Sequence, residues 1–412
     1  MKIALVSNFL PPVGRGGAEL YVSELAEALT HEHDVTVFSG SLHGEAGGAT
    51  VRRIPSLPPL SPNSSLAGKA AWHARDQWLR SVHLALARGL EALAPDVVHS
   101  HEPQGLSAAV FTAIARAGIP HVHTAHDLNL LCAQVTMTRG GAFCGGRCAG
   151  CAVQRFIRGR LIRRRLDALI CHSNFIRERH LAAEIVAAES IVTIPFGVRA
   201  GQARLRTFSP YLRIGFLGSL TPQKGLLTLL AAFSTCPPTW ELAVAGSGPL
   251  EPLIRERVQN DRRTHYAGFV SGSDKEMFFE KVDVVVIPSE MEEAASLVAI
   301  EAAARGIPAI VSNRGGLPEL PHVIVFEAGR VDSLRGALSL FAAEPGRLEA
   351  ASKSLLDVSE QFKWSHHVDR VEAVLKAAAH PNDPDLSAGR GLRAGVEHAP
   401  ENSQNVFGCR VP

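Results

Sequence analysis

The sequence lacks several features that would assign it to a class at once, and each absence excludes a kind of protein. No apolar run approaches the roughly eighteen residues of a membrane span, and the stretch Met1–Asn8 is too short for a signal peptide. The 42 Lys and Arg exceed the 40 Asp and Glu by only 2, so no general positive field supports nucleic-acid binding. We therefore expect a soluble, cytoplasmic protein that binds no nucleic acid.

The chain is also poor in charge and in cysteine. Charged residues make up 20% and apolar residues 46% of the sequence, which excludes large-scale disorder. Seven cysteines, an odd number spread over 412 residues, do not match a secreted disulfide scaffold. The length exceeds what a single hydrophobic core usually fills, so we expect two domains.

Apolar runs of strand length alternate with segments of helical period, which is typical of a parallel sheet covered by helices. The expected strands are Lys2–Ser7, Asp34–Phe38, Asp96–His99, Pro120–Thr124, Ala168–Ser173, Ile191–Phe196, Leu212–Leu217, Glu241–Ala245, His265–Val270, Asp283–Pro288 and Pro308–Ser312. The expected helices are Ala18–Leu29, Ala70–Leu93, Leu106–Ala117, Arg155–Arg165, Val331–Ala343, Leu348–Leu356 and His366–Ala379.

The pattern restarts at Leu212, after a stretch rich in Gly, Arg and Ser at 198–210 that we interpret as a linker. Near-continuous apolar strands such as Val284–Ile287 indicate burial on both faces. We predict two doubly wound α/β domains facing a cleft, at 1–205 and 206–365. A helix at 366–380 is a candidate to pack back on the first domain, and the aperiodic residues 381–412 are predicted to be disordered.

A glycine-rich loop, Pro11–Glu19, follows the first expected strand and precedes a helix. Its Gly16 and Gly17 allow the backbone to approach a ligand closely, and the helix N-terminus favours an anion. The spacing does not match the dinucleotide-binding fingerprint, so a nicotinamide enzyme is a poor fit. A simple turn without a ligand is an equal alternative.

Histidines follow two neighbouring expected strands, at His99 and His101 and again at His121, His123 and His126. A histidine at the carboxyl end of a strand can bond sugar hydroxyls or carry a proton near neutral pH. We interpret His99, His121 and His123 as core histidines bonded to backbone carbonyls. His126, at the strand terminus, is the functional candidate.

Charged residues follow the strands of the second half. Lys224 follows a strand and is expected to begin a helix, where a lysine beside helix N–H groups suits a diphosphate. A solvated surface lysine is the alternative. Glu293 lies in a loop after Asp283–Pro288 and Glu301 lies eight residues later in the following helix, so both can face one cleft.

Four signals in order make the chain resemble the retaining nucleotide-sugar glycosyltransferases of family 4. They are the segment Gly218–Gly225, the segment Val244–Pro249, the pair Glu293 and Glu301, and the segment Gly315–Glu319. The resemblance covers roughly residues 1–380. It implies the two-domain GT-B fold with two Rossmann-like domains, the acceptor mainly on the first and the nucleotide sugar mainly on the second.

The resemblance also implies roles for individual residues. Lys224 would hold the donor diphosphate, Glu301 the ribose hydroxyls, and Glu293 the hydroxyls of the transferred sugar. His126 would lie near the anomeric centre, with the Gly16–Gly17 turn against the donor phosphate or the acceptor. The implied catalytic residues are His126, Lys224 and Glu293, and the implied donor-binding residues are Gly16, Gly17, Lys224, Gly246, Ser296, Leu297 and Glu301.

In this family the chemistry resembles a same-face displacement in which the leaving diphosphate helps to deprotonate the acceptor. No carboxylate nucleophile and no cofactor is then required, because Lys224 and N–H groups near Ser296 and Leu297 can stabilise the leaving group without a divalent metal. The chain departs from the family at Ser219, where Arg is common, and at Ala295 and Ser296, where an aromatic and a glycine are common. These departures leave the sugar unassigned.

Four cysteines, Cys132, Cys144, Cys148 and Cys151, fall in an insertion at 130–152 after His126. Four thiolates that include a CxxC pair can form a tetrahedral structural zinc site, and free thiols in a loop are the alternative. Some polysaccharide-type members of the family carry a similar insertion. A metal would explain how this glycine-rich segment holds its shape.

The segment Arg155–Arg165 contains six arginines interleaved with apolar residues. On a helix they are candidates to bind an anionic membrane surface or a lipid-diphosphate acceptor, which would make the protein peripheral at the inner face of a membrane. A solvated basic helix face is the alternative.

We predict a retaining glycosyltransferase that moves a sugar from a nucleoside diphosphate-sugar to an acceptor hydroxyl, in polysaccharide, glycolipid or glycoconjugate biosynthesis. The alternatives are a nucleotide-sugar epimerase on the same architecture and a non-catalytic sugar- or nucleotide-binding subunit.

Overall fold

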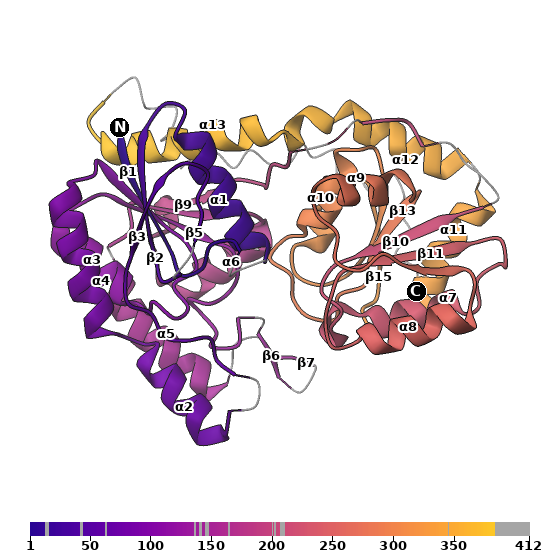
Figure 1. The fold of residues 1–412 in the computed structure, drawn as a ribbon, viewed down its shortest axis with the longest axis horizontal. Helices are drawn as coiled ribbons and strands as arrows, with labels where there is room; N and C mark the ends of the chain where they lie inside the picture. The colour runs from indigo at the N-terminus through magenta and orange to yellow at the C-terminus, as the bar shows by residue number, and fades with distance from the viewer. Residues whose placement is uncertain are drawn as a thin grey trace. The chain divides into compact units, whose positions relative to one another are not determined.

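The computed structural model describes residues 1–12, 16–41, 44–61, 64–135, 137–139, 142–144, 148–163, 165–199, 201, 203–206, 211–344 and 346–383. The chain divides into two compact units (Figure 1). The described residues of unit 1 are within 1–138, 144–195 and 368–383, and those of unit 2 are within 139–143 and 196–367. The chain leaves unit 1 after residue 195, whereas the sequence analysis placed the domain boundary at 205. Most of the predicted disordered tail, 384–412, lies outside the described residues.

The described part of unit 1 is built on a parallel sheet of seven strands in the order β3-β2-β1-β4-β5-β8-β9. The strands are β1 (Lys2–Ser7), β2 (Asp34–Ser39), β3 (Thr50–Arg53), β4 (Val97–Ser100), β5 (His121–Ala125), β8 (Ala168–Cys171) and β9 (Ile191–Thr193). Neighbouring residues Ile3 and Ala4 point to opposite faces and are both fully buried, as expected where helices cover both sides. The strand order reverses at β1, and ligands bind beside such switch points, at the carboxyl ends of the strands.

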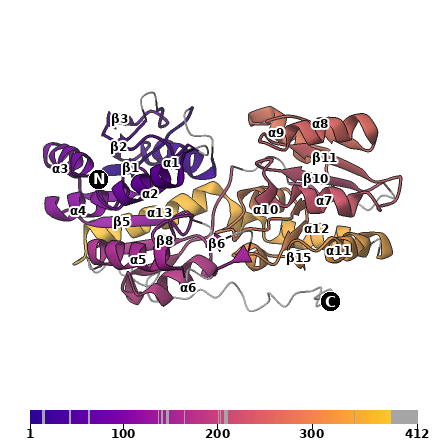
Figure 2. The same cartoon turned by 90° about the horizontal axis from the view of Figure 1, so that it is seen from below.

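Helices cover both sides of the unit 1 strands. They are α1 (Gly17–Leu29), α2 (Leu66–Arg75), α3 (Arg80–Leu93), α4 (Ala109–Ala117), α5 (Ala149–Ile162) and α6 (Asn174–Ala183). Figure 2 shows α3 and α4 on one side and α1 on the other. Most of α13 (Trp364–Ala379) also belongs to unit 1, where Glu372 pairs with His33 at 2.9 Å. A short pair, β6 (Thr138–Arg139) and β7 (Ala142–Phe143), lies in the cysteine-bearing insertion.

The single helix expected at Ala70–Leu93 is wrong, because the chain forms α2 and α3 with a break after Asp76. The Asp76 carboxylate is buried and accepts hydrogen bonds from the backbone N–H of Gly105 at 2.7 Å and from Arg158 at 2.8 Å. Both partners are remote in sequence, so a helical period read locally misses the break. The helix expected at Arg155–Arg165 is α5, which begins and ends earlier.

The described part of unit 2 contains a parallel sheet of six strands in the order β12-β11-β10-β13-β14-β15. The strands are β10 (Arg213–Leu217), β11 (Glu241–Ala245), β12 (Thr264–Tyr266), β13 (Val284–Ile287), β14 (Ala309–Ser312) and β15 (Val323–Phe326). The sequence analysis missed β15 and found the other five. As in unit 1, the strand order reverses beside the first strand of the unit, here β10.

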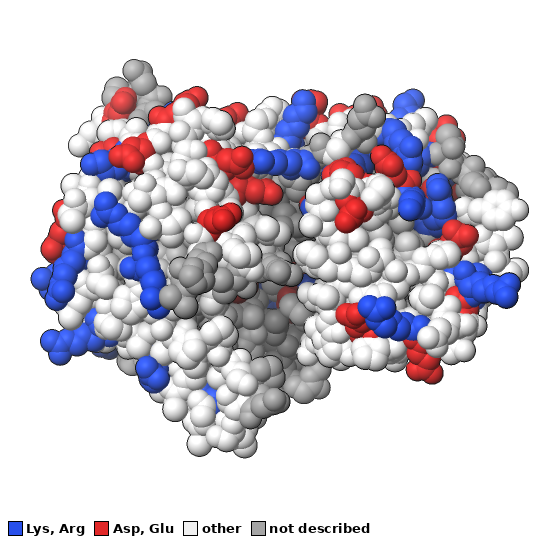
Figure 3. Space-filling view, in the orientation of Figure 1, with Lys and Arg blue, Asp and Glu red and all other residues white. Residues whose placement is uncertain are grey.

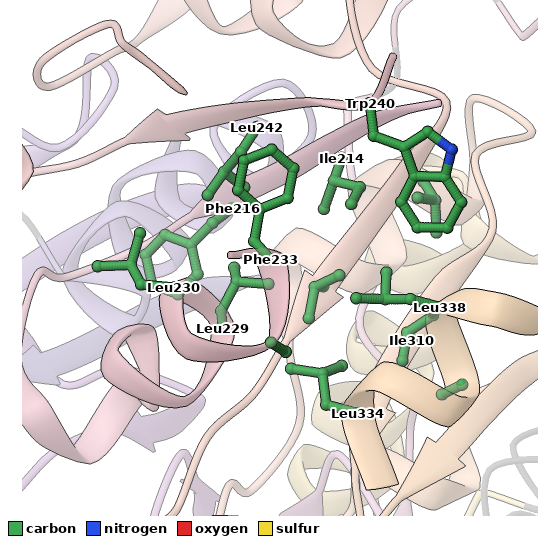
Figure 4. Packing of buried hydrophobic residues seen from close by; sticks show 14 of the residues in the cluster. Ile214, Phe216, Leu229, Leu230, Phe233, Trp240, Leu242, Ile310, Leu334 and Leu338 are labelled. Carbon is green, nitrogen blue, oxygen red and sulfur yellow. The ribbon is translucent and has the colours of Figure 1, made fainter. Parts of the chain in front are cut away.

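The helices of unit 2 are α7 (Leu226–Phe233), α8 (Glu251–Asn260), α9 (Gly272–Glu280), α10 (Leu297–Ala303), α11 (Val331–Ala343) and α12 (Gly346–Asp357). Helix α7 buries Leu226, Leu229, Leu230 and Phe233, whose spacing places them on one face. Figure 4 shows side chains of this face packing beside Phe216 of β10 and neighbouring core residues. The packing fixes the loop that precedes α7.

Lys224 does not begin a helix as expected. It ends a 3-10 turn, Pro222–Lys224, and Gly225 separates this turn from α7. Basic and acidic side chains alternate over the face of unit 2 visible in Figure 3, in keeping with the net charge of +2. Among the residues that the structure describes, no helix combines the length and hydrophobicity needed to cross a membrane.

Candidate functional site

Loops at the carboxyl ends of the unit 2 strands bring Lys224 and Glu293 together. The Nζ of Lys224, after β10, donates to Glu293 Oε1 at 2.5 Å. Ser289, after β13, donates its hydroxyl to the same oxygen at 2.5 Å. Glu293 is only 9% exposed, so its carboxylate is held from two sides at the edge of the sheet. We term these three residues the Lys224–Glu293 cluster.

The segment Gly315–Glu319 supports the backbone of Glu293. The N–H of Gly316 donates to the Glu293 carbonyl at 2.8 Å, and the N–H of Gly315 donates to the carboxylate of Glu292 at 2.6 Å. Gly315 has a φ of +58°, and a Cβ built on it would lie 2.0 Å from the Glu293 carbonyl oxygen. Only glycine fits there, so the close approach of the two backbones explains why this motif has glycine at position 315.

Gly246 joins two neighbouring loops of the same edge. Its φ is +133°, and a Cβ built on it would lie 1.8 Å from the carbonyl oxygen of Gly218. The loops after β10 and β11 therefore meet backbone to backbone. Tyr266 donates its hydroxyl to the Gly246 carbonyl at 2.9 Å. The donor-binding role of Gly246 stays a prediction, while its part in holding the loops is clear.

The start of α10 contains Ser296, Leu297 and Glu301. Ser296 caps the helix, its hydroxyl accepting from the N–H of Ala299 at 3.3 Å, and Leu297 is the first helical residue. The carboxylate of Glu301 accepts from Lys275 Nζ at 2.5 Å. Glu301 is therefore bonded to Lys275, whereas Glu293 is bonded to Lys224 and Ser289.

A separate pocket lies at the carboxyl ends of β4 and β5 in unit 1. Its lining residues are Glu102, Pro103, His123, Thr124, Ala125, His126, Asp127, Asn129 and Leu130. The pocket includes His126, the histidine singled out from the sequence. It also contains two carboxylates that the sequence analysis did not name.

Aromatic rings surround His126. Its Nε2 lies 3.1 Å from Nδ1 of His101, and its ring centroid lies 4.9 Å from that of Tyr21 and 5.3 Å from that of His172. Burial, and then the neighbouring histidines, hold the pKa of His101 well below its ordinary value. His101 is therefore neutral at pH 7 and supports His126 without adding charge.

His99, His121 and His123 are buried and bonded, as interpreted, and hydroxyl groups are among their partners. His99 pairs with Thr124 at 2.7 Å. His121 and His123 pair with the hydroxyl of Ser100 at 2.6 and 2.8 Å. Burial lowers the pKa of His121 to about 3. His123 also lines the pocket, so its side chain is part of both the core and the pocket wall.

The carboxylates of Glu102 and Asp127 are the residues that the sequence analysis missed. Burial raises the pKa of Asp127 to about 6, although the N–H of Asn129 donates to it at 2.6 Å. Burial, and then the charges of Glu19 and Asp127, raise the pKa of Glu102 well above its ordinary value. Glu102 also has a φ of +25°, a strained value of the kind found at functional sites. Each residue directly follows a histidine at a strand end, a signal that was available in the sequence.

The Gly16–Gly17 turn contributes to unit 1 near these acids. Gly16 is the cap residue of α1, and Gly17 is its first residue. The Glu19 carboxylate lies over Gly16, because a Cβ built on Gly16 would meet Glu19 Oε2 at 2.4 Å. A negative side chain thus already lies at this helix N-terminus. The predicted contact of this turn with a donor phosphate or the acceptor stays a prediction.

Two family models match the chain, one after the other. The model described as Glycosyltransferase Family 4 matches residues 15–202, and the model described as Glycosyl transferases group 1 matches residues 211–344. The chain belongs to glycosyltransferase family 4. It is therefore a glycosyltransferase, as the motifs of its second half predicted.

Curated relatives of this glycosyltransferase match most of its length. An uncharacterized 42.6 kDa protein in the cps region of Klebsiella pneumoniae is 25% identical over 79% of this chain and 88% of its own. The glycogen synthase of Mycobacterium tuberculosis H37Rv is 27% identical over 88% of this chain and 92% of its own.

Solved structures confirm the fold. Anabaena HepE in complex with UDP has a TM-score of 0.70 at 18% identity, covering 92% of this chain and 100% of its own. Sucrose-phosphate synthase from Thermosynechococcus elongatus has a TM-score of 0.68 at 19% identity, covering 91% and 98%. The predicted α/β class with two Rossmann-like domains, the GT-B fold, is correct.

The four cysteines of the insertion in this glycosyltransferase all belong to unit 1, and none forms a disulfide. The thiol of Cys151 contacts Cys148 and Cys132, and burial followed by these contacts raises its pKa to about 12. Cys144 instead donates its thiol to the Met137 carbonyl at 3.1 Å. Cys151 thus lies beside two of the other predicted ligands, but no three of these four described cysteines bring their ligand atoms within 4.8 Å of one another. Residues 136, 140, 141 and 145–147 of the insertion lie outside the described part.

The arginine segment of the glycosyltransferase differs from the expected basic helix face. Arg158 is 1% exposed, pairs with Asp76 at 2.8 Å and donates to the Asn129 carbonyl at 2.8 Å. It lies on the buried face of α5 with Cys151 and Gln154, at helical spacing. A surface role for Arg158 is therefore wrong.

The other arginines of this segment differ in their exposure to solvent. Arg160 and Arg163 are exposed, and Arg155 and Arg165 are partly buried. Arg164 lies outside the described residues. Fewer positive charges than expected are thus available to a membrane, and peripheral membrane contact stays a prediction.

Proposed function

We propose that this glycosyltransferase moves a sugar from a nucleoside diphosphate-sugar to an acceptor hydroxyl with retention at the anomeric carbon. The Lys224–Glu293 cluster carries the proposal, because it places an ammonium and a buried carboxylate 2.5 Å apart at the ligand-binding edge of a doubly wound sheet. A diphosphate pairs with the cation, and sugar hydroxyls donate to the carboxylate.

The proposed reaction uses groups that are already oriented. As the bond to the anomeric carbon breaks, negative charge develops on the leaving diphosphate, and Lys224 stabilises it together with N–H groups at Ser296 and Leu297. Glu293, held by Ser289, keeps its orientation when Lys224 turns to the phosphate. The leaving phosphate takes the acceptor proton. The proposal uses no carboxylate nucleophile and no cofactor.

The nucleotide is assigned to Glu301. One carboxylate can accept both ribose hydroxyls, and Lys275 holds that of Glu301 in place at 2.5 Å. The side chain of Glu301 is 15% exposed, so one face remains accessible to a ligand.

The acceptor is assigned to the unit 1 pocket. Glu102 and Asp127 offer hydrogen-bond acceptors to the hydroxyls of a sugar, and His126 lines the same pocket. The acids make this pocket better suited to a neutral, hydroxyl-rich ligand than to a phosphate. We propose the same for the Gly16–Gly17 turn, where Glu19 supplies a negative charge.

The similar proteins support this reading. The HepE structures contain UDP, UDP with glucose, or UDP-glucose, which supports a nucleotide-sugar donor. The glycogen synthase relative supports a sugar acceptor within a polysaccharide. We therefore place the product among polysaccharides, glycolipids or glycoconjugates.

A donor panel tests the proposal. UDP-, ADP- and GDP-sugars are incubated with and without sugar acceptors, nucleoside diphosphate release is measured, and the product linkage is determined by nuclear magnetic resonance. We expect acceptor-dependent release and an anomeric configuration equal to that of the donor. A free epimeric nucleotide sugar, an inverted linkage, or binding without turnover would each contradict it.

The nucleotide assignment has its own test in the variant Glu301→Ala. Calorimetric affinity for the released nucleoside diphosphate should fall at least about tenfold, because two charge-assisted hydrogen bonds are lost. Glu349→Ala, at an exposed position of α12, is the matched control and should bind as the parent does. An unchanged affinity of Glu301→Ala removes this residue from the site.

A further inference from the structure

We propose that Lys275 determines which pentose the donor site accepts in the nucleotide. Its ammonium donates to the oxygen of one ribose hydroxyl, and Glu301 accepts the hydrogen bond that the same hydroxyl donates. The pair thus selects ribonucleotides and rejects a deoxyribonucleotide that lacks this hydroxyl. The inference rests on the proposed nucleotide site at Glu301 and adds a second residue to it.

Lys275 and Glu301 lie on two helices that both begin at the ligand-binding edge of the unit 2 sheet. Lys275 is the fourth residue of α9, which follows β12, and Glu301 is the fifth residue of α10, which follows β13. The side chains of the two helices meet (Figure 1), with Lys275 Nζ 2.5 Å from Glu301 Oε1. A nucleotide that reaches Glu301 from this edge therefore also reaches the ammonium.

A second ion pair already joins these helices. The guanidinium of Arg305 donates twice to the carboxylate of Glu276, at 3.0 and 2.5 Å, and lies 4.7 Å from the centre of the Phe279 ring. Arg305 is buried, and its Nη1 also donates to the Glu301 carbonyl at 2.6 Å. The contact between the helices and the backbone of Glu301 are thus held without Lys275.

Lys275 has hydrogen-bond donors left for a ligand. Its side chain is 30% exposed, and an ion pair with that access to water adds little to stability. Within the described part of the chain it donates only to Glu301 Oε1. Further N–H groups of the ammonium and the second oxygen of the carboxylate therefore remain for a ligand.

A hydroxyl group is the ligand that uses both. It donates one hydrogen bond and accepts others, whereas a carboxylate only accepts and an ammonium only donates. A ribose hydroxyl between Glu301 and Lys275 forms two charge-assisted hydrogen bonds, and both groups lose a partner when it is missing. A phosphate in the same place would be repelled by the Glu301 carboxylate, so Lys275 does not form a second diphosphate site.

Calorimetry of the full chain with deoxy analogues tests the proposal. UDP, ADP and GDP are titrated first, and the one that binds most tightly is compared with its 2′-deoxy and 3′-deoxy forms. We expect the parent to bind one of these forms at least about tenfold more weakly than the ribonucleotide, because two charge-assisted bonds are lost.

The variant Lys275→Met removes the ammonium and keeps the apolar stem. Its affinity for the ribonucleotide should fall about tenfold, whereas its affinity for the rejected deoxy form should stay within about twofold of the parent value, because that ligand lacks the hydroxyl that Lys275 contacts. The other deoxy form keeps this hydroxyl and should lose affinity as the ribonucleotide does. Lys275→Met should unfold at the urea midpoint of the parent, because Arg305 and Glu276 still join the helices.

Lys353→Met, at an exposed position of α12, is the matched control and should bind all three nucleotides as the parent does. Three results would overturn the inference and leave the nucleotide site in place. The parent binds both deoxy forms as tightly as the ribonucleotide, Lys275→Met keeps full affinity while Glu301→Ala loses it, or Lys275→Met weakens all three ligands equally. The last result would mean that Lys275 only orients Glu301.

A different result would overturn the nucleotide assignment and this inference with it. It is unchanged affinity in both Glu301→Ala and Lys275→Met, or no binding of UDP, ADP or GDP to the parent.

Discussion

The carboxyl group of Asp127 is buried in surroundings that disfavour its ionised form. Burial raises its pKa to about 6, and the nearby carboxylate of Glu102 is also shifted upward, so the two groups compete for ionisation. The N–H of Asn129 and the charge of Arg158 offset only part of this penalty. Such unfavourable burial is common where a group is kept for function and not for stability.

The variant Asp127→Asn should be more stable than the parent at neutral pH. A carboxyl whose folded pKa is raised favours the folded state at low pH, and this contribution is lost as the pH rises from about 4 to about 6. The shift from 3.8 to about 6 corresponds to at most about 3 kcal/mol at pH 7. Urea unfolding of unit 1 should show this gain at pH 7 and none near pH 4.

The amide of Asp127→Asn can still accept from Asn129, so the local geometry is kept. Activity should fall even though stability rises. Asp369→Asn, at an exposed position of α13, is the control and should change neither. If the stability of the parent protein does not change between pH 4 and pH 6, Asp127 does not lower its stability at neutral pH.

Ser219 offers a gain-of-function prediction. It is exposed in the loop between β10 and Lys224, where the family commonly has an arginine. In Ser219→Arg a second positive charge should tighten UDP binding by about fivefold or more, on Coulomb attraction near a protein surface. Uridine, without phosphates, should bind as before, and Ser339→Arg on α11 should have no effect. Calorimetry that finds equal UDP affinity would place residue 219 away from the diphosphate.

At the scale of elements, the loop after β14 positions the loop after β13. In Gly315→Ala the new Cβ meets the Glu293 carbonyl, which is backbone and cannot rotate away, and φ is +58°. We expect at least about tenfold lower activity and a loss of about 1–3 kcal/mol in unfolding free energy. Gly346→Ala has no atom within 4 Å of the new Cβ and is the control. A fully active Gly315→Ala would mean that the Glu293 loop adjusts freely.

A buried ion pair, Arg158 with Asp76, helps to hold helix α5. Removing the cation in Arg158→Met leaves the Asp76 carboxylate buried and uncompensated, which should cost about 3–5 kcal/mol. Adding Asp76→Leu should recover part of this loss, because neither charge is then left alone. Chemical denaturation of the two variants measures the coupling, and simple additivity of their effects would contradict it.

The sequence predicted elements well where local pattern decides and poorly where distant contacts decide. Strands β1 and β11 are found to the residue, because each is a short apolar run that begins at a charged residue, and the run of β1 is buried on both faces. The break between α2 and α3 depends on Arg158 and Gly105, which no local period reveals. Strand β15 was missed although it is just as apolar as its neighbours.

The candidate site shows the same division. Lys224 and Glu293 were singled out from their motifs, and the structure brings them to 2.5 Å. The pairing of Glu301 with Lys275, and the burial of Arg158 within an arginine-rich segment, depend on tertiary packing and were not foreseen. The carboxylates of Glu102 and Asp127 were visible in the sequence, but their raised pKa values depend on burial and, for Glu102, on neighbouring negative charges, which only the folded chain brings together.

At the scale of the whole molecule, two units with separate cores should respond separately to ligand. UDP that binds only folded unit 2 raises its stability by mass action, by about 2.7 kcal/mol at a hundredfold excess over Kd. We expect hydrogen exchange to slow in β10, β13 and α10 and to stay unchanged in β1 and β4. Equal slowing in both sets would contradict donor binding by unit 2 alone.

Because of helix α13, the two units are completed at different times during synthesis. Unit 2 is almost continuous in sequence, whereas unit 1 requires residues 368–379, including the buried Val371, Val374 and Leu375, from far beyond it. A nascent chain therefore completes the second unit before the first. The N-terminal sheet is translated first, but α13, its last helix, leaves the ribosome only near the end of synthesis. Until then the surface of unit 1 that α13 covers stays exposed. This is the stage at which a chaperone has most to protect.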